Sequence, residues 1–143
     1  MSDLSLRQAD SSDSNNLFDL RNHPQVRRHS HSPDVISLDK HQSWFQKTLL
    51  DVSKKIYIAE EEDNFIGMVR LDFIDGAYLM SWAVSPKFQG RGFGKEMVSM
   101  GSKTTGGIIK AAIKQSNKAS IKIAEHIGMK LTQKIGDTLF YQK

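Results

Sequence analysis

The chain has no cysteine. Disulfide bonds, thiolate metal ligands and a cysteine nucleophile are therefore excluded, and this composition fits a cytoplasmic protein. The chain also lacks any apolar run near the ~18 residues that a membrane-spanning helix needs, so we expect no membrane partner. The first residues, Met1-Ser2-Asp3-Leu4, do not lead from a basic segment into an apolar one, as a secretory signal would.

Internal repeats and low-complexity tracts are missing as well, and the length of 143 residues is typical of one domain, which we place at 1–143. Hydrophobic residues make up 38% and charged residues 25%, as in ordinary globular proteins. The net charge of +4 favours an anionic ligand such as a nucleotide or coenzyme. A nucleic-acid surface and a charge that serves only solubility remain alternatives.

The front half of the chain predicts helices around one short strand. We expect a strand at 4–9, a helix that begins at the polar cluster 10–13 and ends before Pro24, a loop or short helix at 27–33, and a helix from Ser37 to Leu50. In the last of these, Trp44, Phe45, Leu49 and Leu50 form one apolar stripe, which we expect to face a core.

The back half predicts a meander of strands and then a strand–helix–strand order. We expect strands at 55–60 and 65–73, a turn at Asp75-Gly76, a strand at 77–84, helices at 94–103 and 117–126, a strand at 108–113 and a closing hairpin at 130–142. The nearly uninterrupted apolar run at 77–84 predicts a central strand buried on both faces. The order indicates a mixed α/β chain with one central sheet.

The stretch from Trp82 to Lys95 carries the chemistry. A buried strand ends at Pro86, and a loop with glycines at 90, 92 and 94 opens a helix. Glycines let backbone N–H groups approach a ligand closely, and a helix N-terminus adds free donors and partial positive charge. This arrangement predicts a phosphate site with Arg91 and Lys95 as counter-charges.

Two other phosphate loops do not fit. A nucleoside-triphosphate loop needs Ser or Thr after Gly-Lys, but Gly94-Lys95 is followed by Glu96. The dinucleotide fingerprint has the spacing G-x-G-x-x-G near the first strand of a longer domain, whereas the spacing here is G-x-G-x-G well inside the chain.

The loop resembles the coenzyme A loop of the GNAT N-acetyltransferase superfamily, which reads Gln or Arg, two residues, Gly, one residue, Gly or Ala. Gln89, Gly92 and Gly94 satisfy this pattern, and Val84-Ser85-Pro86 stands where that family ends its fourth strand. The resemblance implies a three-layer α/β/α fold whose mostly antiparallel mixed sheet is splayed between strands 4 and 5. A glycine-rich turn without a ligand is the competing interpretation.

The resemblance also implies a set of coenzyme-binding residues. The pantetheine arm would pair with strand backbone near Ala83 and Val84, and Asn117 would contact it or serve only as a helix cap, two compatible roles. The pyrophosphate would lie on the loop amides of Gln89, Gly90, Arg91, Gly92, Phe93, Gly94 and Lys95. The implied reaction is direct transfer from acetyl-CoA to a primary amine, without a metal.

The chain departs from the family at its acid and base. Many members place a tyrosine seven residues after the helix asparagine to protonate the thiolate, and here that residue is Ala124. The position that often supplies the base is Tyr78, whose reference pKa near 10 suits a base poorly at neutral pH. Tyr78 as a packing residue, with proton removal through solvent, is the alternative.

The words Asn22-x-Pro24-x-Val26-Arg27 and His41-x-x-Trp44-Phe45 resemble the branch that acetylates nucleotide-linked amino sugars, as in pseudaminic acid pathways. This second resemblance implies that Asn22, Arg27, His41 and Trp44 bind the acceptor, with the Arg27 fork on a diphosphate.

Several alternatives remain open for the acceptor and for the activity. Trp44 could serve the core, Arg27 could be solvated, and similar words occur in branches that act on ribosomal-protein N-termini. His29 and His31 fit a polar loop better than a metal site. Rival functions are acetylation of a peptide or protein amine and a non-catalytic module that binds coenzyme A or nucleic acid; we do not expect a nucleic-acid partner.

Overall fold

The fold is taken from a computed structural model that describes residues 3–143, so Met1 and Ser2 lie outside the described residues. A seven-stranded sheet has the order β1-β2-β3-β4-β5-β7-β6, and β4–β5 is its parallel pair while the other neighbours are antiparallel. The strands are β1 Ser5–Gln8, β2 Lys54–Glu61, β3 Asn64–Ile74, β4 Ala77–Val84, β5 Ile109–Lys114, β6 Lys130–Ile135 and β7 Thr138–Gln142. The helices are η1 Ser11–Asp13, α1 Ser14–Asn22, α2 Pro24–Arg27, α3 Leu38–Leu50, η2 Pro86–Phe88, α4 Phe93–Ser102 and α5 Lys118–His126.

Capping residues set the helix boundaries of the front half. Asp10 forms a capping box with Asp13 at the start of η1, which runs directly into α1. Pro24 stops α1 and opens α2, because proline tolerates the first helical position but disfavours helix in the residue before it. Ser37 caps α3 by accepting a hydrogen bond from the Lys40 N–H. These boundaries confirm the sequence prediction.

Two tight turns join β2, β3 and β4. Glu62 and Asp63 have φ of 50° and 67°, and Asp75 and Gly76 have φ of 50° and 82°. Positive φ at both central residues matches the twist of antiparallel strands. The expected hairpins are therefore present.

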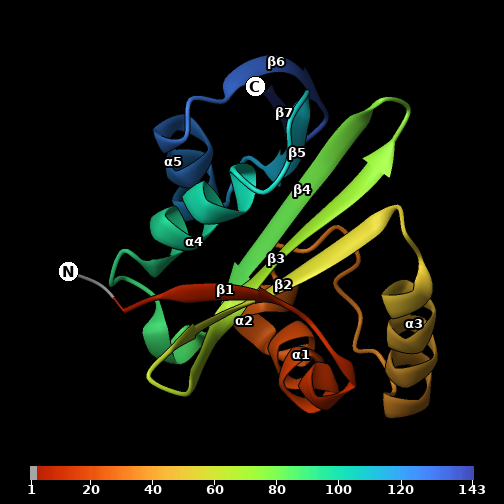
Figure 1. The fold of residues 1–143 in the computed structure, drawn as a ribbon. Coiled ribbons are helices and arrows are strands. Elements are labelled where there is room, and N and C mark those ends of the chain that lie inside the picture. The colour runs from red at the N-terminus through yellow and green to blue at the C-terminus, as the bar shows by residue number, and fades with distance from the viewer. Residues whose placement is uncertain (1–2) are drawn as a thin grey trace.

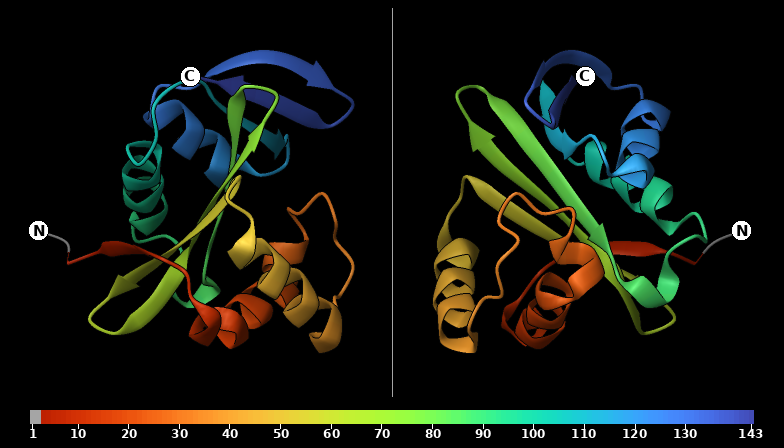
Figure 2. Two further views of the ribbon diagram at one scale, coloured as in Figure 1. Left: turned by 45° about the vertical axis from the view of Figure 1, so that its right-hand side comes forward. Right: turned by 180° about the vertical axis from the view of Figure 1, so that it is seen from behind.

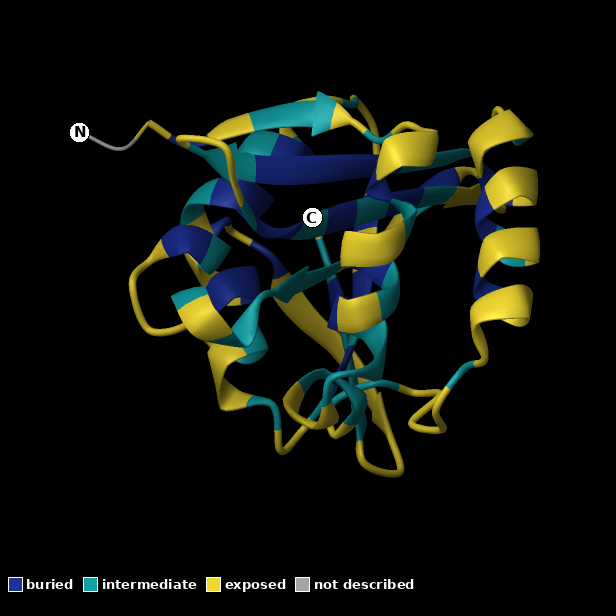
Figure 3. Cartoon of the chain, turned by 90° about the horizontal axis from the view of Figure 1, so that it is seen from below, coloured by how far each residue is buried: buried dark blue, intermediate teal, exposed yellow. Residues whose placement is uncertain are grey.

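The helices cover the two faces of the sheet in separate groups (Figure 1). Alternate residues of β2 show the division: Ile56 and Ile58 pack in a cluster with α1 and α3, whereas Tyr57 and Ala59 pack in a cluster that includes α4 and α5. Figure 2, right, shows α1, α2 and α3 on one side of the strands and α4 and α5 on the other. The three-layer fold is confirmed, and Figure 3 shows the buried residues gathered in its central strands.

The apolar stripe of α3 differs from the prediction. His41, Phe45 and Thr48 are buried, since they recur at the spacing of one helix face, while Leu50 is 85% exposed. Leu49, expected in the same stripe, is also exposed. The prediction was based on hydrophobicity. The rotation of α3 about its own axis determines which side chains face the sheet, and it places His41 and Thr48 there instead of Leu49 and Leu50.

The expected burial of β4 on both faces is also wrong. Ala77 and Met80 are buried, but Leu79 and Ser81 are exposed. Leu79 and Ser81 lie on the face opposite to Met80, so this part of the strand is covered on one face only. In addition, β5 pairs with β4 only at Tyr78↔Ile109 and Leu79↔Lys110, and beyond this point the two strands separate. The predicted splay is present, and it leaves one edge of β4 without a strand partner.

Candidate active site

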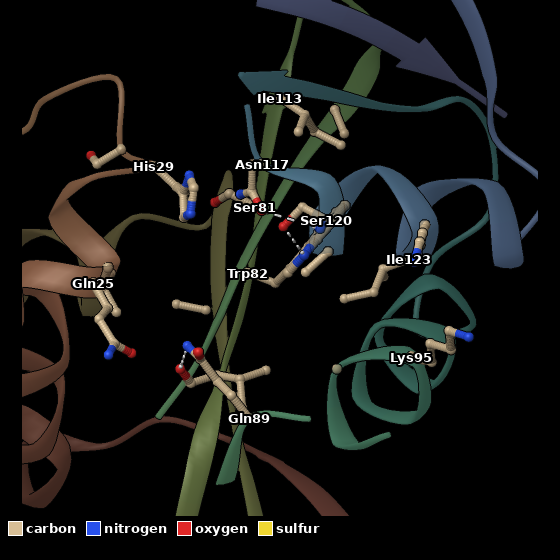
Figure 4. A pocket seen from close by; sticks show the side chains of 18 of the residues that line it. Gln25, His29, Ser81, Trp82, Gln89, Lys95, Ile113, Asn117, Ser120 and Ile123 are labelled. Carbon is tan, nitrogen blue, oxygen red and sulfur yellow. Dashed lines mark hydrogen bonds between the residues drawn. The ribbon is translucent and has the colours of Figure 1, made fainter. Parts of the chain in front are cut away.

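A cavity of about 810 Å³ occupies the region where β4 and β5 separate. Its lining residues come from five segments: 25–31 around α2, Met80–Val84 of β4, 88–95 around the start of α4, Ala111–Ile113 of β5 and 117–123 around α5. Figure 4 shows side chains from these segments converging from both sides of β4. Segments that are far apart in the sequence thus form one site.

The glycine loop forms the wall at the start of α4. Gly90 and Gly92 have φ of 77° and 82°, a region that favours glycine, and a Cβ on either would meet nothing within 4 Å. Gly92 precedes the first helical residue, and no side chain caps the helix there. The first N–H groups of α4 are therefore available to an anion.

Gly94 has a different function from the other two loop glycines. A Cβ at Gly94 would come within 2.7 Å of the Ile123 Cδ1 and 3.4 Å of the Val84 Cγ2. Its small size therefore lets α4 pack closely against α5. The prediction placed all three glycines at the pyrophosphate, and Gly94 reaches this region as a residue of the packed helix that also lines the cavity.

The basic residues of this wall are not equivalent. Lys95 and, on α5, Lys122 line the cavity. Arg91, a predicted counter-charge, is not among the described lining residues; its guanidinium carbon lies 5.7 Å from the ring centre of Phe88 and 5.2 Å from that of Phe93. Phe88 and Phe93 thus hold Arg91 at the outer side of the loop.

Backbone direction along β4 determines which groups face the gap. The Tyr78 N–H donates to Ile108 on the β5 side, whereas the Ser85 N–H donates to Ile66 on the β3 side. Because these directions alternate along a strand, the backbone groups of Trp82 and Val84 face the gap and those of Ala83 face β3. Ala83 and Trp82 both line the cavity, but the backbone of Trp82, which the prediction did not include, faces the gap.

Side chains hold the edges of the gap. Gln89 donates through its Nε2 to the Val84 carbonyl at 3.1 Å, and the Trp82 Nε1 donates to the Ser120 Oγ at 3.1 Å (Figure 4). Asn117 accepts from the Ser120 N–H at 3.2 Å and also lines the cavity, so its two predicted roles are compatible in space. These contacts connect β4 to the loop and to α5.

The predicted acid and base positions lie outside the cavity lining. Ala124 is fully buried in the core. Tyr78 stands where β4 and β5 are still paired, and its ring packs edge-on against Phe73 with centres 5.0 Å apart. The surroundings of Tyr78 are thus those of a packing residue, which was the alternative to a general base.

Two of the residues predicted to bind the acceptor substrate, Asn22 and Arg27, instead form hydrogen bonds that hold the loop between α2 and α3. Asn22 donates from its Nδ2 to the Ile36 carbonyl and accepts from the Ile36 N–H, both at 2.9 Å. Arg27 donates to the Asn22 carbonyl at 3.1 Å and to the Pro33 carbonyl at 3.4 Å. Neither lines the cavity, because their polar groups are directed to the backbone.

The other two residues predicted to bind the acceptor substrate, His41 and Trp44, lie in α3. His41 is fully buried, donates from its Nε2 to the Ser14 carbonyl at 2.9 Å, and stacks on Phe45. Trp44 is half-buried, and the guanidinium carbon of Arg70 lies 5.2 Å from its ring centre. The structure therefore places His41 in the core and Trp44 away from the cavity.

The wall of the cavity around α2 is formed by residues that the prediction did not assign to a ligand. Gln25, Arg28, His29 and His31 come from α2 and the turn after it, and the His31 Nε2 contacts the Ala112 carbonyl of β5 at 3.1 Å. None of the described lining residues carries a carboxylate. The basic run Arg27-Arg28-His29 could have indicated this wall from the sequence. The sequence does not show that Arg27 is directed to backbone carbonyls while the other two residues line the cavity.

The site can be compared with known proteins at this point. A family model described as "Acetyltransferase (GNAT) domain" matches residues 3–130. The chain belongs to the GNAT acetyltransferase family. It is therefore a GNAT N-acetyltransferase, and acetyl-CoA, the cofactor of that family, fits the open glycine loop and the gap beside β4.

Solved structures show the same GNAT fold. Spermidine N-acetyltransferase from Vibrio cholerae with CoA and spermine has a TM-score of 0.85 at 18% identity, covering 99% of this chain and 95% of that one. A ribosomal L7/L12 alpha-N-protein acetyltransferase with coenzyme A has a TM-score of 0.85 at 19% identity, covering 100% and 94%. The Salmonella typhimurium protein yncA with acetyl-CoA has a TM-score of 0.79 at 21% identity, covering 99% and 93%. No curated protein sequence matches the chain.

Residues 3–143 contain neither a cluster of metal-ligating side chains nor a membrane-spanning helix. Within that range, no group of three or more His, Cys, Asp or Glu residues could hold a metal ion. Within the same range, no helix has both the length and the apolar character that crossing a membrane requires.

Proposed function

We propose that this enzyme transfers the acetyl group of acetyl-CoA directly to the primary amine of a nucleotide-linked amino sugar. The observation that carries the acceptor class is the charge of the cavity wall. Arg28 stands on the proposed acceptor side, Lys95 and Lys122 stand on the coenzyme side, and no described lining residue is acidic.

This charge pattern supports a phosphate-bearing acceptor over a polyamine. A polyamine brings several positive charges, which like charges in the wall would repel. The diphosphate of a nucleotide sugar is complementary to the wall, and an arginine fork can bind it with paired hydrogen bonds. The neighbour named for spermidine supports the fold only, because its identity to this chain is 18%.

The residues of the chain would act by binding and orientation. Free N–H groups at Gly92 and Phe93 hold the coenzyme pyrophosphate, and Lys95 neutralises part of its charge. The gap-facing backbone of Trp82 and Val84 holds the pantetheine as an added strand would be held. Bound acetyl-CoA supplies an activated acetyl group. The chain has no cysteine that could form a thioester acyl-enzyme, and in the proposed reaction the amine itself attacks this group.

A panel of acceptors tests the proposal. Thiol release from acetyl-CoA should be fastest with nucleotide-linked amino sugars, slower with the same sugars without the nucleotide, and slowest with spermidine. Acetyl-CoA, but not ATP or NAD, should also raise the melting temperature. At a free concentration about one hundred times its Kd, a ligand that binds only the folded state raises the free energy of unfolding by about 2.7 kcal/mol. A clear preference for peptide N-termini would replace the acceptor with the peptide-amine alternative. Coenzyme binding without thiol release on any amine would favour the non-catalytic module.

A further inference from the structure

We infer that His29 accepts the proton that the acceptor's ammonium group must lose before its nitrogen can attack. The inference rests on the proposed function for the class of amine but adds a residue and a role to it. A protonated amine has no lone pair, so a group in the cavity that removes the proton accelerates the reaction.

Few lining residues could accept this proton. The titratable side chains among the described lining residues are those of Arg28, His29, His31, Lys95 and Lys122. Arginine and lysine side chains are ordinarily protonated near neutral pH and so have no lone pair to offer. The two histidines therefore remain as candidates.

Exposure to solvent separates the two histidines. The His31 Nε2 lies 3.1 Å from the Ala112 carbonyl, and a carbonyl only accepts, so this nitrogen donates a hydrogen bond to β5. The His31 side chain is exposed at the rim of the cavity, whereas His29, two residues earlier, is half-buried. Because water competes less for a base that is partly buried, His29 is the stronger candidate.

His29 lies opposite the point where β4 and α5 meet the cavity. Figure 4 shows its ring on the α2 side, across from Ser81 of β4 and from Asn117. Its Nδ1 is buried and has no hydrogen-bond partner among the described residues. Nε2 is the other ring nitrogen, and it can take a proton from a ligand in the cavity in the tautomer whose proton is on Nδ1.

The surroundings keep this imidazole in the neutral, accepting form. Burial lowers the pKa of His29 below its ordinary value of 6.5, and the positive charges of Arg28 on the same turn and of Lys114 at the end of β5 lower it further. The groups that face it from β4 and α5, Ser81 and Asn117, are uncharged. At pH 7 most His29 side chains are therefore unprotonated, and this fraction falls as the pH drops through the lowered pKa.

The proton transfer gives a balanced reaction. The His29 Nε2 takes one proton from the ammonium, and the freed nitrogen lone pair forms a bond to the acetyl carbonyl carbon. The carbon–sulfur bond of the thioester breaks, and its electron pair leaves with sulfur. The nitrogen then loses its second proton, which passes through water to the thiolate, so that a neutral amide and a free thiol form. His29 returns its proton to solvent.

The test compares His29→Gln with His126→Gln over pH. His126 is exposed in the last turn of α5 and does not line the cavity, so it serves as a matched control. We expect His29→Gln to lower kcat by about 10²–10⁴-fold at pH 7. The deficit should shrink above pH 9, where more of the amine is already deprotonated, and added imidazole should restore part of the activity of His29→Ala. A deficit that is equal at all pH values and insensitive to imidazole would overturn the assignment.

A measurement on the unchanged protein keeps the inference testable if the variants misfold. The His29 ring should titrate by NMR below pH 6.5, and this midpoint should match the acid limb of the kcat/KM profile. Different midpoints would overturn the role of His29. Failure of the proposed acceptor is distinct: it would appear as a different preferred amine, with the His29 pH effect unchanged.

Discussion

Arg27 and Arg28 are adjacent in the sequence but have different surroundings. Arg27 donates to the backbone carbonyls of Asn22 and Pro33, whereas Arg28 lines the cavity. Arg27 is the last residue of α2, and Arg28 begins the turn after it, whose residues His29 and His31 also line the cavity. The predicted diphosphate contact thus moves by one residue, from Arg27 to Arg28.

Arg28→Ala tests this assignment. If Arg28 holds a phosphate of the acceptor, kcat/KM for a nucleotide-linked amino sugar should fall about ten- to a hundredfold, because a charge-assisted hydrogen bond contributes about 1.5–3 kcal/mol. Arg28→Lys should recover part of the loss, since a point charge cannot reproduce the fork. The same sugar without its nucleotide is the control. Equal losses with both acceptors would show that Arg28 supports the turn rather than the phosphate.

Sequence patterns identified the elements better than the directions of their side chains. The caps at Asp10 and Ser37 and the turn at Asp75-Gly76 are local features, so the chain near each of them is sufficient to predict it. The exposure of Leu50 and the burial of His41 depend on how α3 lies against the sheet. Such tertiary contacts have no local signal, which is why His41 was predicted at the acceptor.

At the scale of elements, β4 and β5 produce the site by separating. The resemblance of the loop to its family predicted the splay, and the parallel pairing of only two residues in each strand confirms it. The nearly uninterrupted apolar run at 77–84 had predicted a different environment, a strand buried on both faces. The apolar run of β4 thus includes residues that face a cavity, and hydrophobicity does not distinguish a cavity from a core.

Hydrogen exchange along β4 should reveal which backbone groups face the gap. The amides of Trp82 and Val84 should exchange quickly in the free protein and become protected when acetyl-CoA is added, because they would gain partners in the pantetheine. The amides of Ser81 and Ala83 face β3 and should be protected in both states, which makes them an internal control. Protection that appears at Ser81 and Ala83 instead would contradict the strand direction derived above.

At the scale of the whole molecule, His41 makes stability depend on pH. Burial lowers the pKa of His41, the positive charge of Arg21 lowers it further, and the hydrogen bond to the Ser14 carbonyl opposes both effects. The unfolded chain, with a histidine pKa near 6.5, therefore binds more protons than the folded one just below that pH. The free energy of unfolding should fall as the pH drops from 7 toward 5.

Urea unfolding at pH 7.5, 6 and 5 measures this dependence. A single such histidine contributes at most about 1.4 kcal/mol per pH unit. His41→Gln should flatten the curve, and His126→Gln, an exposed control, should leave it unchanged. His29 has a lowered pKa as well and adds a dependence of the same sign, so the slope that remains in His41→Gln should decrease further in the double variant with His29→Gln. An unfolding free energy that is constant over this range in the unchanged protein would contradict the role of His41.

The division of the cavity between two layers also bears on the order of events in turnover. The turn after α2 forms one wall, on the side of the sheet that carries α1, α2 and α3. The glycine loop and α5 form the other wall, on the side that carries α4 and α5, and the β4–β5 gap lies between the two walls (Figures 2 and 4). With the coenzyme on the glycine loop and the amine on the turn after α2, as proposed, the two reactants would meet at this gap. Neither reactant has to leave before the other enters. A chain of this modest size can therefore hold both reactants at once and needs no moving domain to bring them together.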